Sequence, residues 1–99
     1  KIAAYAAPAK ASTKLNYYGI SSDIIEFIVE DNPLKHNKII PGVNIPIYDV
    51  DYLIEKNIKV VIVLAWNFFD YIVDKNKSLI DKGVRFISIK DLEDPNFNF

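Results

Sequence analysis

The sequence has 99 residues, of which 51% are hydrophobic and 25% charged, and its formal net charge is -1. This length allows one globular domain, and the near-neutral balance excludes the strongly basic surface typical of nucleic-acid-binding domains, so we expect no nucleic-acid partner. The chain contains no cysteine and one histidine, His36. This excludes thiolate zinc sites, iron–sulfur clusters, disulfides, cysteine nucleophiles and multi-histidine metal sites, so we expect no metal site in this chain.

The longest apolar run, Val60 to Trp66, is far shorter than the roughly 20 residues that span a bilayer, and no secretory leader opens the chain. Together with the absence of cysteine, this predicts a cytoplasmic protein without a membrane partner. The chain begins at Lys1 and contains no methionine. We therefore expect it to be a fragment of a longer protein.

Five short apolar runs predict strands: Ile2–Ala6, Ile24–Val29, Asn44–Tyr48, Ile58–Ala65 and Val84–Ile89. The fourth run is the strongest, because it is continuously apolar from Val60 to Leu64. A continuous apolar run is typical of a strand that is covered on both faces, as in a parallel sheet.

Three helical stretches are predicted between these strands: Pro8–Tyr18, Asp49–Asn57 and Asn67–Lys82. Asp49 and Asn67 have side chains suited to cap the second and third helices at their starts. Gly19 and Gly83 follow the first and third helices, where a left-handed residue commonly ends a helix.

Strands that alternate with helices predict an α/β fold, here a Rossmann-like three-layer domain with a mostly parallel sheet of about five short strands and the first strand near its centre. We expect this domain to cover residues 1–93 and residues 94–99 to form a loosely ordered tail. Ligands of such sheets bind beyond the carboxyl ends of the strands. This rule selects three loops: Ala6–Ser12, Glu30–Pro41 and Trp66–Phe69.

The first of these loops has the features of an anion-binding site. Small residues such as Ala7 let a ligand approach the backbone, and a helix that begins near Pro8 directs N–H groups at it. The charge of Lys10 and the hydroxyl groups of Ser12 and Thr13 would suit a phosphate or diphosphate. An ordinary capped helix with a solvated lysine explains the same residues about as well. The helical face that could line a groove carries Lys10, Thr13 and Tyr17.

The second and third loops offer weaker candidates. Glu30 ends the second strand, where dinucleotide-binding folds hold a ribose hydroxyl pair, but a charged strand end before a turn is the simpler interpretation. His36 lies between lysines and shows no partner for base catalysis. Trp66 could stack on a base or sugar or belong to the core, and Asn67 is interpreted as a helix cap.

Three blocks of the sequence resemble one family. The run from Ala4 to Tyr17 reads Ala-Tyr-Ala-Ala-Pro-Ala-Lys-Ala-Ser-Thr-Lys-Leu-Asn-Tyr. It resembles the signature Tyr-Gly-Ala-x-Ala-Lys-Gly-x-Thr-x-Leu-Asn-Tyr of the C-terminal domain of SAM-dependent sugar C-methyltransferases. Similar blocks follow in the same order: Glu30-Asp31-Asn32-Pro33 with Lys35, then Pro41-Gly42 and Ile45-Pro46-Ile47, then Leu64-Ala65-Trp66-Asn67-Phe68. The resemblance covers nearly the whole chain, from about Ala3 to Ile89.

The resemblance implies a fold and a role. Enzymes of this family have a zinc-binding N-terminal module, a central SAM-binding domain and a Rossmann-like C-terminal domain that helps to hold a nucleotide-diphosphate sugar. This chain would then be the substrate-binding domain, with the nucleotide-diphosphate sugar and the central domain as its partners and with SAM and zinc bound elsewhere in the full-length protein. The resemblance places Lys10, Ser12, Thr13 and Asn16 in the substrate groove, and at its edges Glu30, Asn32, Lys35, Trp66 and Asn67.

The chain departs from the family pattern at four positions. Ala6, Ala11 and Asn37 stand where the family has glycine, and Glu30 stands where it usually has aspartate. A non-catalytic nucleotide-binding or protein-interaction domain of Rossmann type therefore stays as the alternative. With no glycine-rich loop for SAM, the isolated 99 residues are predicted not to transfer a methyl group.

Overall fold

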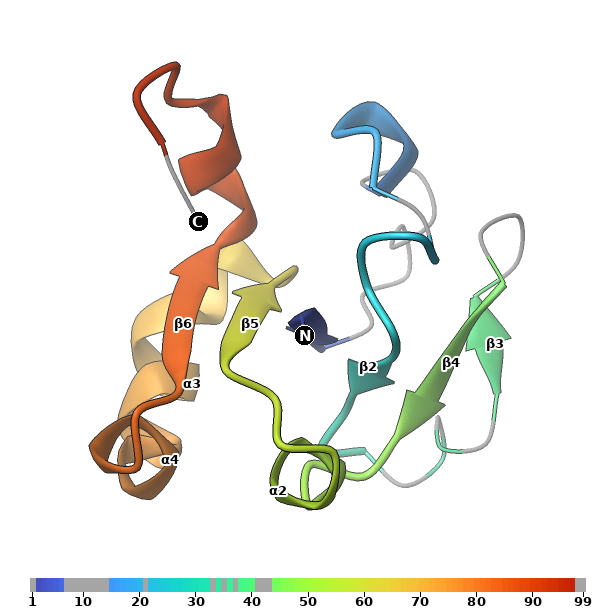
Figure 1. Ribbon diagram of the computed structural model, residues 1–99, viewed down its shortest axis with the longest axis vertical. Coiled ribbons are helices and arrows are strands. Elements are labelled where there is room, and N and C mark those ends of the chain that lie inside the picture. Colours follow the sequence, from blue (N-terminus) through green and yellow to red (C-terminus); the bar gives the residue numbers. More distant parts are fainter. Residues whose placement is uncertain are drawn as a thin grey trace.

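A computed structural model describes residues 2–6, 15–20, 22–32, 34, 36, 38–40 and 44–97. Its strands form one sheet of order β3-β4-β2-β1-β5-β6 (Figure 1), in which β3 is antiparallel to β4 and all other neighbours are parallel. The strands are β1 (Ile2–Tyr5), β2 (Ile28–Val29), β3 (Ile39–Ile40), β4 (Ile45–Tyr48), β5 (Val60–Val63) and β6 (Arg85–Ser88). The mostly parallel α/β sheet with β1 near its centre is confirmed.

Near the middle of the sheet, β1 and β5 pair over four residues each, from Ile2 opposite Val60 to Tyr5 opposite Val63. Ala3 and Ala4 are fully buried, and so are the three residues from Val61 to Val63. Both faces of these strands are therefore covered, which is why β5 has no polar residue.

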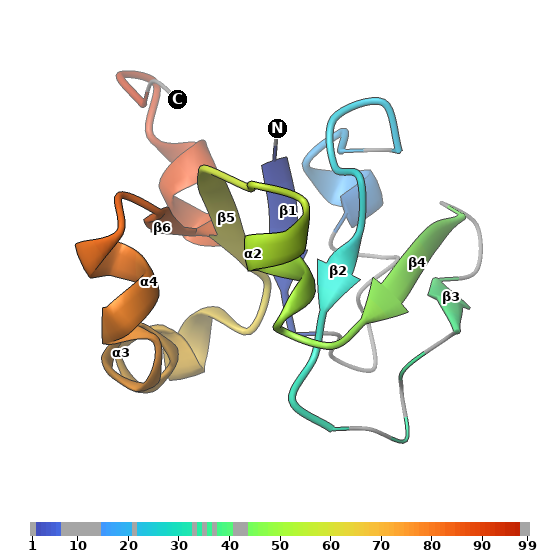
Figure 2. The same ribbon diagram turned by 60° about the horizontal axis from the view of Figure 1, so that its bottom comes forward.

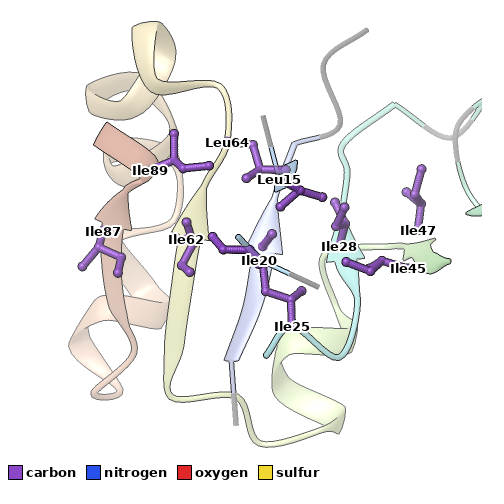
Figure 3. Close-up of a cluster of buried hydrophobic side chains, with 11 residues drawn as sticks. Leu15, Ile20, Ile25, Ile28, Ile45, Ile47, Ile62, Leu64, Ile87 and Ile89 are labelled. Carbon is purple, nitrogen blue, oxygen red and sulfur yellow. The ribbon is translucent and has the colours of Figure 1, made fainter. Parts of the chain in front are cut away.

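Two hydrophobic clusters, one on each face, produce the three layers. Alternate residues such as Ala4, Ile28 and Ile62 join one cluster, together with Leu15 and Ile20 from the segment before β2 (Figure 3). The opposite face is covered by α2 (Tyr52–Glu55), α3 (Phe69–Lys75) and α4 (Lys77–Asp81), which contribute Leu53, Ile72 and Leu79 to the second cluster.

The third predicted helix, Asn67–Lys82, is divided into three pieces: a 3-10 helix η2 (Trp66–Phe68), then α3, then α4. The chain leaves the helical conformation at Asn76, with φ -110° and ψ 29°, where the Asn76 side chain donates to the carbonyl of Ile72. The expectation that Asn67 caps this helix is wrong, because Asn67 lies inside η2, and α3 starts after Phe68 without a side-chain cap.

The second helix and all five predicted strands are shorter than predicted. Helix α2 has four residues and begins at Tyr52 after Asp51, without a side-chain cap, so the prediction that Asp49 caps it is wrong. Asp49 Oδ1 instead accepts the Asp51 N–H at 2.9 Å in the turn before the helix. In β2 only the last two predicted residues pair, and Ile24 lies in an exposed turn. The predicted set of strands also omitted β3, whose two residues pair with Pro46 and Ile45 of β4.

The turns at two glycines follow the sequence. Gly19 has φ +68° and Gly83 has φ +98°, the left-handed conformation expected after a helix. Of the first predicted helix, Pro8–Tyr18, residues 8–14 lie outside the described part, while residues 15–17 are helical. The 3-10 helix η3 (Ile89–Glu93) follows β6, and beyond it Phe97 packs against the first cluster. No helix within the described ranges is long and apolar enough to cross a membrane.

Candidate functional site

Three central strands end at the same level. Tyr5, the last residue of β1, pairs with the last residues of β2 and β5, Val29 and Val63. The segments that begin at Ala6, Glu30 and Leu64 therefore leave the sheet side by side, and we call this region the carboxyl edge. In Figure 2 it faces the bottom of the view, where the loop after β2 and helix α3 lie. The three loops selected from the sequence start here, at the position where parallel sheets bind ligands.

A hydrogen-bonded group of four residues lies at this edge, and we call it the edge network: Tyr5, Asp31, Lys75 and Asn76. The Tyr5 hydroxyl donates to the Asp31 carboxylate, at 3.0 Å from Oδ1 and 2.9 Å from Oδ2. Lys75 Nζ lies 3.1 Å from Asp31 Oδ2. The network thus connects the end of β1, the loop after β2 and the end of α3.

Asn76 completes the network from below the surface. Its side-chain N–H group donates to the Tyr5 hydroxyl oxygen at 3.2 Å and to the Ile72 carbonyl at 2.8 Å. Asn76 is the one buried polar residue within the described ranges, and Tyr5 is almost fully buried beside it. A buried amide requires such partners, because leaving it unpaired costs about 1–3 kcal/mol. The break between α3 and α4 is thus tied to the end of β1.

The protonation states in the network have clear causes. Burial raises the pKa of the Tyr5 phenol well above its ordinary value of 10.0, the hydrogen bond from Asn76 opposes this, and Asp31 adds to the rise. The hydrogen bond to Asp31 also raises the pKa of Lys75. At neutral pH Tyr5 is therefore the donor, and Lys75 is the cation that faces the Asp31 carboxylate.

The loop after β2 is folded by its own polar groups. Glu30 Oε2 accepts the backbone N–H of Asn32 at 2.9 Å, and Asn32 Oδ1 accepts that of Leu34 at 3.1 Å. His36 Nε2 lies 2.6 Å from the Glu30 carbonyl oxygen, so this ring nitrogen carries a proton and donates. These bonds hold Glu30 and Asn32 at the carboxyl edge.

Ala6 has an unusual backbone conformation for its residue type. Its φ is +72°, in the left-handed region that glycine adopts freely and alanine avoids at a cost of about 1–2 kcal/mol. Its N–H nevertheless donates to the Val29 carbonyl at 2.8 Å, which holds the turn in place. This is the first of the three positions where the family pattern noted above has glycine, so the fold retains the turn without the residue that favours it.

The segment after β5 presents an aromatic side chain at the surface. Trp66 is 42% exposed, and Lys90 Nζ lies 3.9 Å from the centroid of its ring, a close cation–π contact. Of the two interpretations of Trp66, the core position is excluded. Asn67 beside it is also exposed.

The structure brings only some of the candidate residues together. Glu30, Asn32, Trp66 and Asn67 follow strands at the carboxyl edge. Asn16 and Tyr17 are exposed and lie on the helical segment, blue in Figure 2, whose Leu15 packs into the first cluster. The other candidates lie outside the described residues: Ala7, Pro8, Lys10, Ser12, Thr13 and Lys35.

The edge network was missed in the sequence, for a simple reason. Asp31 adjoins Glu30 and could have been chosen with it, and Tyr5 is the one large polar side chain in its strand. Their partners come from far along the chain, since Asn76 is 71 residues from Tyr5. No local sequence pattern predicts such a contact.

The residues present do not fit the cofactors that the resemblance assigns to the full-length enzyme. The sequence offers no thiolate for zinc, and within the described residues no three His, Cys, Asp or Glu side chains form a group that could hold a metal ion. The sequence after β1 reads Ala-Ala-Pro-Ala-Lys-Ala and contains no G-x-G-x-x-G fingerprint, the loop with which a Rossmann fold binds a dinucleotide.

Comparison with known proteins gives the same family as the three sequence blocks. The model of the C-methyltransferase C-terminal domain matches residues 1–89. The chain is 35% identical over 86 residues to the C-methyltransferase NovU of Streptomyces niveus, an alignment that covers 87% of this chain and 20% of that protein. The chain thus spans about a fifth of the length of this relative.

Proposed function

Because this chain belongs to the family of C-methyltransferase C-terminal domains, we propose that its carboxyl edge binds the nucleotide-diphosphate sugar substrate of a SAM-dependent C-methyltransferase. One observation carries the proposal: β1, β2 and β5 end level with one another, so the three family-like blocks start at one edge of the sheet. This is where open parallel sheets bind nucleotides.

The contribution of such a domain to catalysis is orientation. A substrate held by its base, diphosphate and sugar presents one carbon to the methyl donor. Because the two reactants are already positioned, the reaction does not have to wait for a correctly oriented collision. The proposal assigns methyl transfer, SAM and zinc to other domains of the full-length enzyme, with the central SAM-binding domain as partner of this one. It also retains the cytoplasmic location expected from the sequence.

The roles of the individual residues follow their chemistry. Lys10, Ser12 and Thr13 would hold the diphosphate, and Glu30 would accept hydrogen bonds from sugar hydroxyl groups. Trp66, exposed and already in contact with a cation, would stack on the base or the sugar. Asn32, Asn67 and Lys35 would border the groove, whereas the roles of Asn16 and Tyr17 stay predictions from the resemblance.

The charges of Asp31 and Lys75 in the edge network cancel, so the network does not repel an anionic ligand at this edge. Asp31 alone would repel a diphosphate, but the ammonium group of Lys75 lies 3.1 Å from its carboxylate and offsets the negative charge. Tyr5 and Lys75 also hold the start of the loop after β2, so Glu30 has a defined position before any ligand arrives.

Calorimetric titration of the 99-residue chain with dTDP-glucose and UDP-glucose tests this proposal. We expect binding, and we expect Lys10→Ala to weaken it by roughly 1.5–3 kcal/mol, or about ten- to hundredfold, because a charge-assisted contact is lost. Lys77→Ala, which removes an exposed lysine of α4, is the matched control and should leave the affinity unchanged.

Two results would count against the proposal. Equal affinity of Lys10→Ala and the unchanged chain would remove Lys10 as the diphosphate anchor. No binding of either nucleotide sugar at millimolar concentration would favour the alternative, a Rossmann-type domain that interacts with other proteins. Independently of binding, incubation of the isolated chain with SAM and a nucleotide sugar should yield no methylated product.

A further inference from the structure

A small cavity of about 90 Å³ lies between helices α2 and α4, and we call it the amino-end pocket. Its lining includes Ile58 and Lys59, which come directly before β5, and Val84, which comes directly before β6. In Figure 1 both helices lie beside the starts of these two strands. The pocket is therefore at the other end of the sheet from the carboxyl edge, and none of its described lining residues belongs to the candidate site or to the edge network.

The pocket lies between two helix ends that are built in the same way. The turn after α2 has Asn57 at φ +54°, and the turn after α4 has Gly83 at φ +98°. Two equivalent hydrogen bonds close these turns: the Ile58 N–H donates to the Leu53 carbonyl at 3.0 Å, and the Val84 N–H to the Leu79 carbonyl at 3.1 Å. This is the Schellman pattern, which takes a chain from a helix directly into the next element. Backbone hydrogen bonds therefore fix the walls of the pocket.

The interior of the pocket is apolar. Leu53, Ile58, Leu79 and Val84 line it, are almost fully buried and belong to the second cluster, while Ile54 at the mouth is 57% exposed. Sites for whole small molecules usually measure about 300–1,000 Å³, which is several times more than this pocket offers. Its volume is instead near that of about three water molecules, at roughly 30 Å³ each. The pocket can therefore take one aliphatic side chain.

Two lysines make the mouth of the pocket basic. Lys59 and Lys82 are exposed lining residues, and no carboxylate is among the described residues that line the pocket. Glu55 and Asp81 belong to the same two helices but do not line it. Within the described part of the chain, neither lysine ammonium group forms an ion pair. Each helix end contributes a partial negative charge of at most about half a unit, so the mouth keeps a net positive charge.

The pocket also lies where the preceding part of the polypeptide enters the domain. The family model describes a C-terminal domain, and the alignment covers only 20% of the related C-methyltransferase, so enzymes of this family carry most of their length before this domain. The domain is entered at β1, whose Ile2 pairs with Val60, the residue after Lys59. Neighbouring strands are about 4.8 Å apart, so the polypeptide that leads into β1 passes close to the pocket.

We propose that the amino-end pocket docks a segment of the preceding domain in which one aliphatic side chain is flanked by carboxylates. The aliphatic side chain fills the apolar interior, and the carboxylates face Lys59 and Lys82. Such a contact fixes the orientation of this domain relative to the one before it, which a linker alone leaves free. The inference rests on membership of the family and holds whether or not the carboxyl edge binds a nucleotide sugar.

Chemical-shift mapping of the 99-residue chain tests the proposal, with the peptide acetyl-Glu-Leu-Glu-amide as the probe. We expect weak, millimolar binding and shifts of the backbone amides of Ile54, Asn57 and Val84, which line the pocket. Acetyl-Glu-Ala-Glu-amide leaves the interior unfilled and should bind about tenfold more weakly. Acetyl-Lys-Leu-Lys-amide fills the interior but places like charges at the mouth, so it should also bind more weakly than the first peptide.

Substitutions at the mouth test the charge preference. Lys59→Gln and Lys82→Gln change exposed side chains, so the fold should stay intact. Each should weaken binding of the Glu-Leu-Glu peptide about two- to fivefold, the effect of one exposed ion pair. Lys77→Gln changes an exposed lysine of α4 outside the pocket, so it is the matched control and should leave the affinity unchanged.

Several results would overturn the proposal. Binding of either control peptide as tight as that of the Glu-Leu-Glu peptide would show that the pocket selects no aliphatic side chain or no carboxylate. Unchanged affinity of the double variant Lys59→Gln/Lys82→Gln, or no shifts at high millimolar peptide, would also contradict it. Shifts of the same amides that grow with protein concentration, without peptide, would assign the pocket to a second copy of this chain. All these amides lie away from the carboxyl edge, so failure here is distinguishable from failure of the nucleotide-sugar site.

Discussion

The centre of the sheet and its carboxyl edge are held by different forces. At the centre, β1 and β5 are paired along their length and their side chains are almost entirely apolar and buried. At the edge, hydrogen bonds join Tyr5 to Asp31 and to Asn76. An ion pair joins Asp31 to Lys75, and the side chains of this pair are partly exposed. The centre therefore provides stability, while the edge provides polar groups that can change without loss of the fold.

The largest effect is expected at the centre. Ile62 is fully buried in β5, and Ile62→Ala should lower the free energy of unfolding by about 2–5 kcal/mol through lost burial and a residual cavity. Urea titration measures this. Ile54→Ala is the matched control, since Ile54 is 57% exposed and its loss should cost less than about 0.5 kcal/mol. If Ile62→Ala fails to fold, Ile62→Val should cost about 0.5–1.5 kcal/mol.

The next effect comes from the buried member of the edge network. Asn76→Ala removes the donors to the Tyr5 hydroxyl and the Ile72 carbonyl and should cost about 1–3 kcal/mol in the same urea experiment. Asn67→Ala, at an exposed position of η2, should stay within about 0.5 kcal/mol of the unchanged chain. Equal stabilities of the two variants would mean that Asn76 does not tie α3 and α4 to β1.

Stability should also depend on alkaline pH through Tyr5. Burial raises the pKa of folded Tyr5 above 10.0, so between the two pKa values the folded chain keeps a proton that the unfolded chain releases. The stabilisation is complete below pH 10 and is lost above it, by at most about 1.4 kcal/mol per pH unit. Lys75, whose pKa Asp31 raises, contributes a loss in the same direction.

Urea titrations between pH 9 and pH 11 separate these groups. Tyr5→Phe should make the loss shallower without abolishing it, because Lys75 still titrates. A slope that is the same in Tyr5→Phe and in the unchanged chain would contradict the buried, proton-retaining state of Tyr5.

The smallest effect concerns the turn at the edge itself. Ala6→Gly removes the cost of a left-handed alanine but adds backbone freedom to the unfolded chain, so we expect a net stabilisation of up to about 1 kcal/mol. Ala65→Gly, at φ -82°, has no such cost to remove and should be destabilising by about 0.5–1 kcal/mol. Melting temperatures that fall in both variants would show that position 6 is not strained.

The same contrast explains what the sequence could predict. The continuous apolar run of β5 and the turns at Gly19 and Gly83 are local signals, and they predicted the parallel sheet and its carboxyl edge correctly. The break at Asn76 and the pairing of β3 with β4 were missed because each depends on a partner that lies elsewhere in the chain.

The candidate residues divide in a similar way. Glu30, Asn32 and Trp66 could be placed at the edge, because the apolar runs of the sequence predict where each parallel strand ends and so which residues follow it. The edge network could not be found, because Tyr5, Lys75 and Asn76 meet only when β1 and α3 pack together. The rings of Phe27, Tyr48 and Tyr52, which contact one another, likewise show no common spacing, since Phe27 precedes β2 and the two tyrosines come from β4 and α2.

The most direct test of the account is an amide chemical-shift map of the chain with dTDP-glucose, referenced to the map of the chain without ligand. We predict that the nucleotide sugar adds shifts at Ala6, Glu30, Asn32 and the indole N–H of Trp66, the only tryptophan. Added shifts confined to other parts of the chain, or no added shifts at saturating ligand, would contradict a substrate site at the carboxyl edge.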